Sequence, residues 1–276
     1  MTSAAGGILL VGCGKMGGAL LSGWIDAGRA PGSICVVEPE DATFAKAVSP
    51  LPAGIGHVKS PHELSGAYRP DIVVVAVKPQ IMDEVAPNLR RFAQDGIAVL
   101  SIAAGRTIDY FQDALGKRAA IVRAMPNTAA SIGRGITAAI ANAYVGADQH
   151  ALCDALLAAV GEVVWLTDEG QMDAVTAVSG SGPAYVFLLA ECLAKAGEEA
   201  GLPQKLAAQL ARATVAGAGA LLVTSPEEPA KLRQNVTSPG GTTEAALKVL
   251  MARGGLQALM TKAVAAATKR SHELAQ

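Results

Sequence analysis

The N-terminal part of the chain contains the stretch Ile8-Leu9-Leu10-Val11-Gly12-Cys13-Gly14-Lys15-Met16-Gly17. A short apolar run, typical of a buried strand, is followed by glycines in G-x-G-x-x-G spacing and then by a helix-like stretch. In this arrangement Gly12 permits a tight turn, Gly14 lets the backbone approach a pyrophosphate, and Gly17 lets the helix pack closely on the strand. The helix start offers unpaired N–H groups to phosphates. The stretch, from Gly12 to Gly17, therefore predicts a dinucleotide-binding turn.

An acidic residue stands where such a turn needs one. Glu38 ends the second apolar run, at about the spacing expected for the residue that binds the adenosine ribose. A carboxylate there accepts hydrogen bonds from both ribose hydroxyls of NADH and repels the 2′-phosphate of NADPH. We therefore expect NADH or NADPH as cofactor, with Glu38 favouring NADH. The alternative is a solvated loop carboxylate, because Pro39 and Glu40 make the position of the acceptor ambiguous.

The first part of the chain continues as β-branched runs alternating with helix-like stretches, which is typical of an α/β fold with a mostly parallel, doubly wound sheet. Helix-like stretches are Gly18–Ala27, Asp83–Arg91 and Asp148–Val160. The expected strands are Ile8–Val11, Ile34–Glu38, Asp71–Val77, Ile97–Ser101, Ala120–Arg123, Thr137–Ile140 and Val163–Leu166.

Ligands of parallel sheets bind at the carboxyl ends of the strands. Two later strand ends should therefore line the cofactor crevice beside the glycine turn. The first carries Ala76, Val77, Lys78 and Pro79, and the second carries the small residues Ala103, Ala104 and Gly105, which allow a flat ring to approach the backbone.

Strand signals stop near residue 167, and helices follow. We expect a Rossmann domain at 1–167 and an all-α domain at 168–276. Prolines at helix starts and a glycine at a helix end bound the first two helices. The expected helices are Pro183–Ala200, one of roughly 20 residues from Pro203, Thr243–Met251 and Leu256–Leu274.

The helix Pro183–Ala200 is apolar almost all round in its first turns, from Tyr185 to Leu193. A helix without a polar face needs cover on every side. We expect a second subunit to supply that cover, so the sequence predicts a homodimer through the C-terminal helices. The alternative is a monomer in which this helix is central.

Composition excludes several partners. The formal net charge is -1, no run of Lys or Arg stands out, and only 4% of residues are aromatic, so a nucleic-acid partner is not indicated. The apolar run at residues 8–11 is too short for a signal peptide or a spanning helix. The four cysteines form no CxxC pair. We expect no membrane, no metal site and a cytoplasmic location.

A second glycine-rich stretch, Ser238-Pro239-Gly240-Gly241-Thr242-Thr243, precedes a helical run. Its glycines let the backbone curl, and the helix start adds N–H groups, so it suits a small carboxylate. Ser238, Thr242 and Thr243 add hydroxyl donors. The alternative is a capped helix start, which explains one hydroxyl rather than three.

Three further strings occur in order along the chain: Met125-Pro126-Asn127-Thr128, Ala177-Val178-Ser179-Gly180-Ser181-Gly182-Pro183-Ala184-Tyr185 and Val236-Thr237-Ser238-Pro239-Gly240-Gly241-Thr242-Thr243. With the glycine turn and Ala76-Val77-Lys78-Pro79, they resemble the pyrroline-5-carboxylate reductase family over nearly the whole chain. The resemblance implies hydride transfer to 1-pyrroline-5-carboxylate giving L-proline, and dimers that assemble further, up to a decamer.

By the same resemblance, the substrate loop comprises Val236, Thr237, Ser238, Gly240, Gly241, Thr242 and Thr243. Glu169 would lie near the substrate ring and Asn235 would reach the cofactor. Lys15 departs from the Asn or Gln that is frequent in the family, and Glu38 departs from the Ser, Asn or Arg that suits NADPH.

The reaction needs little acid–base machinery, because a protonated cyclic imine is already electrophilic at carbon and positioning carries much of the catalysis. We expect the hydroxyl of Thr243 to bond to the ring nitrogen and to deliver or steady its proton, with Ser238 and Glu169 as the other catalytic candidates.

Two rival functions remain open. A β-hydroxyacid-type dehydrogenase needs a base, for which Lys195 is the lysine in the Pro183–Ala200 helix; a non-catalytic dinucleotide sensor has no need of the Ser238–Thr243 stretch.

Overall fold

The computed structural model of the chain describes residues 7–275, which form two compact units. Of the described residues, the first unit comprises 7–180 and 268–275, and the second comprises Ser181–Ala267. The boundary expected after residue 167 therefore falls inside the first unit. Residues 1–6 of the expected first domain and residue 276 of the second lie outside the described residues.

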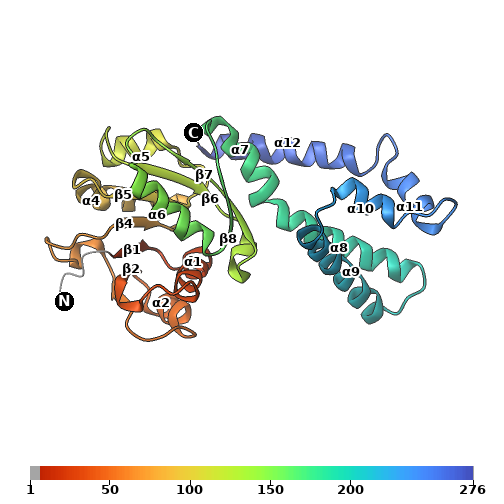
Figure 1. Ribbon diagram of the computed structural model, residues 1–276, viewed down its shortest axis with the longest axis horizontal. Coiled ribbons are helices and arrows are strands. Elements are labelled where there is room, and N and C mark those ends of the chain that lie inside the picture. Colours follow the sequence, from red (N-terminus) through yellow and green to blue (C-terminus); the bar gives the residue numbers. More distant parts are fainter. Residues whose placement is uncertain (1–6, 276) are drawn as a thin grey trace. The chain divides into compact units, whose positions relative to one another are not determined.

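The first unit contains one sheet of eight strands in the order β3-β2-β1-β4-β5-β6-β7-β8 (Figure 1). Every neighbouring pair is parallel except β6 and β7, which are antiparallel. The order reverses direction at β1, which pairs with both β2 and β4. The strands are β1 Ile8–Val11, β2 Ile34–Val37, β3 Gly56–Val58, β4 Ile72–Val75, β5 Ala98–Ser101, β6 Ile121–Met125, β7 Gly135–Ala141 and β8 Gly161–Trp165.

Helices cover both faces of this sheet, as the alternating pattern predicts. On one face α1, α2 and α6 pack over side chains such as Leu10 and Val74, with Trp24 of α1 fully buried. On the other face α3, α4 and α5 pack over Leu9 and Val73. The helices are α1 Lys15–Asp26, α2 Asp41–Val48, α3 Met82–Val85, α4 Arg90–Gln94, α5 Ile108–Leu115, α6 Ala147–Ala158 and α7 Met172–Val175.

The mostly parallel α/β fold is confirmed, but two local predictions are wrong. The strand β3 was not predicted, because its three residues carry no alternating apolar pattern. The stretch Asp83–Arg91 is not one helix: it is divided into α3, a 3-10 turn at Ala86–Leu89 and α4. Pro87 lies in that turn, and a proline lacks the N–H that an α-helix interior requires.

The second unit is helical. Pro183 stands in the first turn of α8, and Gly201, with φ of 100°, follows its end. A short helix, α10, lies between α9 and α11 and was not predicted. The helices are α8 Gly182–Glu199, α9 Gln204–Thr224, α10 Pro229–Asn235, α11 Thr242–Leu250 and α12 Leu256–Ala275, whose last residues belong to the first unit.

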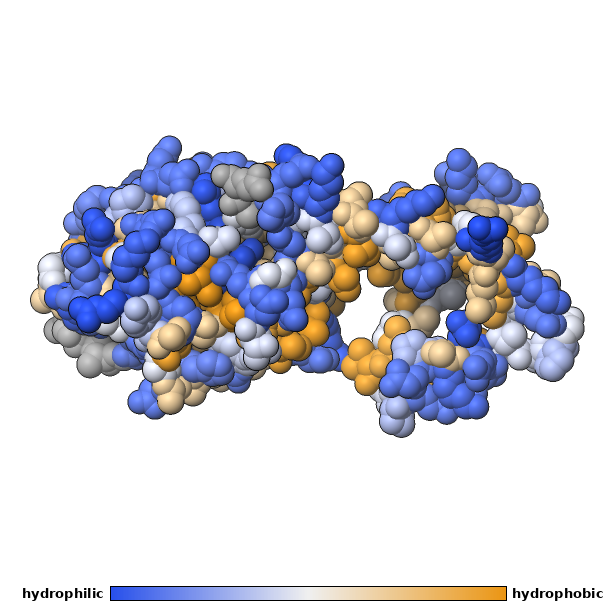
Figure 2. Space-filling model, turned by 90° about the horizontal axis from the view of Figure 1, so that it is seen from above, coloured by the Kyte–Doolittle hydropathy of each residue, from blue (hydrophilic) through white to orange (hydrophobic). Residues whose placement is uncertain are grey.

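Apolar side chains of this unit reach its surface (Figure 2). No residue of α8 is buried within the chain, and Phe187 and Leu188 are 63% and 57% exposed. Within the described part of the chain α8 is therefore not a central helix, and the alternative of a monomer built around it is wrong. The helix needs cover from outside the chain, since burial of such side chains is worth about 1.5–3 kcal/mol each.

Candidate active site

The glycine turn between β1 and α1 has the geometry that its spacing predicts. Gly12 has φ of 88°, and its N–H donates to the carbonyl oxygen of Val37 at 2.9 Å. A Cβ atom on Gly17 would lie 2.2 Å from the carbonyl oxygen of Gly12, so only glycine allows α1 to start this close to the turn. The turn follows the carboxyl end of β1 and is hydrogen-bonded to the carboxyl end of β2, at the point where the strand order reverses.

The start of α1 fits a bound pyrophosphate. Gly14 is exposed, and a Cβ atom added there would meet nothing within 4 Å, so the side facing solvent is open. Gly14 is also the N-cap of α1, where the side-chain cap is missing and the first turn has no acidic residue. Lys15 instead places a cation at the positive end of the helix dipole, which costs about 0.3–1 kcal/mol. An anion at this helix start offsets that cost.

Glu38 lies against the same turn. The residue as a whole is only 8% exposed; Oε2 of its carboxylate accepts from the Cys13 N–H at 3.1 Å, and Oε1 accepts from the Glu40 N–H at 3.3 Å. The Cys13 thiol is buried beside it. Burial, and then the charge and hydrogen bond of Glu38, raise the pKa of Cys13 to about 12, so this thiol is neutral. The carboxylate thus stands at the end of β2 and is held by the glycine turn.

The two other strand ends lie at the same edge of the sheet, because β1, β4 and β5 are adjacent and parallel. After β4, the Ala76 N–H donates to the carbonyl of Val11 at 2.8 Å. After β5, the Ala103 N–H donates to Oγ of Ser101 at 3.2 Å, and Ala103 is buried. The structure therefore brings together the residues expected to line the crevice: Ala76, Val77, Lys78 and Pro79 with Ala103, Ala104 and Gly105 beside the Gly12–Gly17 turn.

Glu169 has partners within the first unit. Its Oε1 accepts from Arg123 Nη1 at 2.7 Å and from the backbone N–H of Ile108 at 3.0 Å. Arg123 is almost fully buried in β6, and Ile108 is the first residue of α5. The carboxylate therefore neutralises a buried cation and satisfies an N–H group at a helix start.

Two of the motifs that carry the family resemblance meet in space. Nδ2 of Asn127 donates to Oγ of Ser179 at 3.3 Å, and a Cβ atom on Gly180 would lie 2.4 Å from Cε of Met125. Ser179 and Gly180 belong to a π-helical turn, Thr176–Gly180. This contact was not predicted from the sequence, since nothing in either string indicates its spatial neighbour.

The Val236–Thr243 segment of the second unit is curled, as expected. Gly240 has φ of 69°, and the Gly241 N–H donates to the carbonyl of Ser238 at 3.0 Å. The Gly240 N–H donates to Oε2 of Glu244 at 2.6 Å, a contact that sequence reasoning missed. Glu244 lies in the first turn of α11 and so holds the curl from the helix side.

No side-chain hydroxyl of this segment caps the start of α11. Gly241 is the N-cap of α11 and has no side-chain cap, which argues against the capped-helix alternative. Ser238 and Thr242 are exposed, and Thr243 is half-buried. Asn235, expected to reach the cofactor, donates from Nδ2 to Oε2 of Glu227 at 2.7 Å.

Comparison with known proteins identifies the family. A pyrroline-5-carboxylate reductase of Pseudomonas aeruginosa is 41% identical over 269 residues, 98% of this chain and 97% of that protein. One of Synechocystis sp. is 41% identical and covers 96% of this chain and 97% of that protein. The chain belongs to the pyrroline-5-carboxylate reductase family. Its residues 169–274 match the family described as pyrroline-5-carboxylate reductase dimerisation, and residues 7–105 match NADP oxidoreductase coenzyme F420-dependent.

Solved structures agree with this membership in the family. A pyrroline-5-carboxylate reductase from Coxiella burnetii superposes with a TM-score of 0.90 at 38% identity, covering 98% of this chain and 99% of that one. A Plasmodium falciparum pyrroline carboxylate reductase with NADP bound gives 0.81 at 28% identity, covering 98% of both chains. As a member of this family, the chain is an NAD(P)H-dependent oxidoreductase.

The match to the dimerisation family explains the exposed helices of this reductase family member. Segments Glu169–Glu199 and Gln204–Thr224 are long and apolar enough to cross a membrane by length and composition. They lie within the residues that match the dimerisation family. Their apolar faces therefore serve oligomerisation, as the sequence predicts for the Pro183–Ala200 helix.

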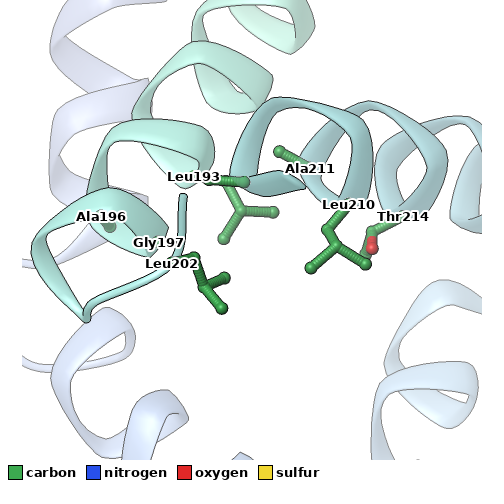
Figure 3. A pocket seen from close by; sticks show the side chains of 8 residues that line it. Leu193, Ala196, Gly197, Leu202, Leu210, Ala211 and Thr214 are labelled. Carbon is green, nitrogen blue, oxygen red and sulfur yellow. The ribbon is translucent and has the colours of Figure 1, made fainter. Parts of the chain in front are cut away.

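A cavity of about 410 Å³ lies between α8 and α9 in this helical unit (Figure 3). Its lining is apolar apart from Thr214, so it offers no charge or cluster of donors to a carboxylate. All of its lining residues lie within the part of the chain that matches the dimerisation family. The other lining residues are Leu193, Ala196, Gly197, Leu202, Ala207, Leu210 and Ala211.

Proposed function

We propose that the chain reduces the ring C=N bond of 1-pyrroline-5-carboxylate to give L-proline, with NADH or NADPH as the hydride donor. The observation that carries the proposal is the curled segment Ser238–Thr243, which leads into an uncapped helix start rich in hydroxyl groups. Such a segment suits a small anionic ring and is superfluous in a protein that only binds a dinucleotide.

The Gly12–Gly17 turn holds the pyrophosphate of the cofactor through the N–H groups at the start of α1. Glu38 binds the adenosine ribose and favours NADH, because its charge repels a 2′-phosphate. The loops Ala76–Pro79 and Ala103–Gly105 hold the remainder of the cofactor. When bound, the reduced nicotinamide supplies a hydride ion.

The N–H groups at the start of α11 hold the substrate carboxylate, together with the hydroxyls of Ser238 and Thr242. The other substrate contacts are Val236, Thr237, Gly240 and Gly241. The hydroxyl of Thr243 bonds to the ring nitrogen and steadies its proton while the imine carbon accepts the hydride. Positioning of the ring supplies most of the rate enhancement, since the protonated imine is already electrophilic.

Two of the expected site residues are already hydrogen-bonded to other groups of the protein. Glu169 is a positioning residue, because its Oε1 already accepts hydrogen bonds from Arg123 and from the start of α5. Asn235 is kept in the proposal as a cofactor contact, and its Nδ2 donates to Oε2 of Glu227 at 2.7 Å.

The assembly in this proposal is a homodimer through the C-terminal helices, and dimers associate further into a decamer. The protein works in the cytoplasm and binds neither nucleic acid nor membranes. The net charge of -1 supports the first exclusion, and the match of the apolar helices to a dimerisation family supports the second.

One assay tests the function. Purified protein is mixed with NADH or NADPH, and absorbance is followed on addition of 1-pyrroline-5-carboxylate, with proline measured by mass spectrometry. We expect one cofactor oxidised for each proline formed. If the protein oxidised a β-hydroxyacid with NAD(P)⁺ and did not reduce the pyrroline acid, the result would favour the dehydrogenase that uses Lys195. Cofactor binding without any turnover would favour the sensor.

A further inference from the structure

A cluster of three polar side chains joins the two crevice loops of the first unit. Arg106 directly follows the loop Ala103–Gly105, and its Nη2 donates to the carbonyl oxygen of Pro79 at 2.9 Å. Pro79 ends the loop after β4. The same Nη2 lies 3.3 Å from Oδ2 of Asp83, and the Arg106 side chain is 24% exposed. One guanidinium thus connects the chain after β5 to the chain after β4.

Tyr110 completes the cluster from the first turn of α5. Its hydroxyl donates to Oδ1 of Asp83 at 2.6 Å, and Cζ of Arg106 lies 4.5 Å from the centre of its ring. The guanidinium is therefore held in plane by stacking as well as by its hydrogen bonds. Both oxygens of Asp83 accept bonds from this cluster, so each member fixes the other two.

The charges of the cluster persist over the working pH range. The hydrogen bond from Tyr110, followed by the charge and hydrogen bond of Arg106, holds the pKa of Asp83 below its usual value. Burial, followed by the hydrogen bond and charge of Asp83, raises the pKa of Tyr110 to about 12. Asp83 therefore stays ionised and Tyr110 stays protonated, which preserves both hydrogen bonds.

We propose that Arg106 is a positioning residue for the nicotinamide cofactor, because it fixes the spacing of the two loops, Ala76–Pro79 and Ala103–Gly105, between which the cofactor binds. The inference rests on the proposed function, which assigns these loops to the cofactor. Fixing both loops before binding lowers the ordering cost that the dinucleotide otherwise has to overcome. The effect is on cofactor affinity, and the guanidinium need not contact the cofactor or the substrate.

A second arginine provides a matched control on the opposite edge of the same two strands. Arg69 precedes β4, and its Nε lies 3.0 Å from Oδ2 of Asp95, which precedes β5. It also donates to the carbonyl of Gly66 at 2.7 Å. Arg106 and Arg69 therefore make similar bonds, but only Arg106 lies at the carboxyl ends of the strands.

The experiment measures the dissociation constants of NADH and NADPH by fluorescence, with steady-state kinetics and thermal unfolding, for wild type, Arg106→Met, Arg106→Lys and Arg69→Met. In Arg106→Met we expect a roughly tenfold weaker cofactor affinity, equivalent to about 1.4 kcal/mol, with kcat at saturating cofactor and KM for the pyrroline acid unchanged within about twofold. Arg106→Lys keeps the charge but not the planar contacts, so it should restore about half of that loss on a logarithmic scale. Arg69→Met should lower thermal stability only.

The outcomes separate the two proposals. If Arg106→Met bound the cofactors as tightly as the wild-type protein, the role of Arg106 would be overturned and the proposed function would stand. A loss of affinity in Arg69→Met as large as that in Arg106→Met would also overturn it, because general loosening of the unit would then explain both. Wild-type protein that bound no dinucleotide would overturn the proposed function and this inference together.

Discussion

Gly14→Ala separates cofactor binding from folding stability. Gly14 has φ of -61° and ψ of -161°, an extended conformation that alanine can adopt, and its added Cβ atom would meet no protein atom within 4 Å. Replacing glycine at such a position stabilises a protein by about 0.4–1 kcal/mol through the unfolded chain. For a unit of this size the melting temperature should stay constant or rise by roughly 2–4 °C.

Cofactor binding should respond in the opposite direction. Gly14 is the N-cap of α1, where the pyrophosphate is proposed to bind, and no protein atom fills the space beside it. A methyl group there holds the phosphates away from the N–H groups, and loss of two charge-assisted hydrogen bonds costs about 3 kcal/mol. The dissociation constants of NADH and NADPH should therefore rise by roughly 100-fold.

Gly17→Ala is the contrasting variant on the same turn. Its Cβ atom would lie 2.2 Å from the carbonyl oxygen of Gly12, so the backbone has to shift, at a cost of about 1–3 kcal/mol. Thermal unfolding can be followed by the fluorescence of Trp24, which is 1% exposed in this unit. If Gly14→Ala kept full cofactor affinity, or unfolded as early as Gly17→Ala, the assignment of this turn would be refuted.

Three further predictions concern single side chains. Thr243→Ala should lower kcat by about 10- to 100-fold, as expected for loss of one positioned hydrogen bond, with cofactor KM unchanged; full activity in a stopped-flow assay would move the proton role to Ser238 or water. Glu38→Gln should raise the ratio of kcat/KM for NADPH to that for NADH by roughly tenfold, the effect of removing one repulsive charge near a phosphate; a wild-type enzyme that already strongly preferred NADPH would contradict this reasoning. Glu169→Ala should lower the free energy of unfolding by about 3 kcal/mol, because it leaves the buried Arg123 cation unpaired; normal stability with a lost kcat would show that Glu169 acts on the substrate instead.

Most of the fold could be predicted because its signals are local. Apolar runs locate β1, β4 and β5, and the glycine spacing locates the turn before α1. The strand β3 escaped because the residues Gly56–Val58 are half-buried at the sheet edge and need no apolar alternation. The sequence predicted a mostly parallel sheet but did not indicate that β7 pairs antiparallel with β6, since strand direction depends on connections that the apolar pattern does not encode.

The local geometry of the candidate site could be predicted where one continuous string contains it, and not where distant residues meet. The Gly12–Gly17 and Ser238–Thr243 strings each contain their own donors. The partners of Glu169, by contrast, come from β6 and the start of α5, and an isolated carboxylate in a sequence does not reveal a buried arginine. The cluster of Arg106, Asp83 and Tyr110 was missed for the same reason.

The central claim is that the Ser238–Thr243 segment binds the carboxylate of a cyclic imine, and comparison of 1-pyrroline-5-carboxylate with 1-pyrroline tests it most directly. The two rings share the C=N bond and differ in the carboxylate. If two charge-assisted hydrogen bonds hold that group, at about 1.5 kcal/mol or more each, kcat/KM for 1-pyrroline should be lower by roughly 100-fold or more. Equal kcat/KM for the two rings would contradict the account.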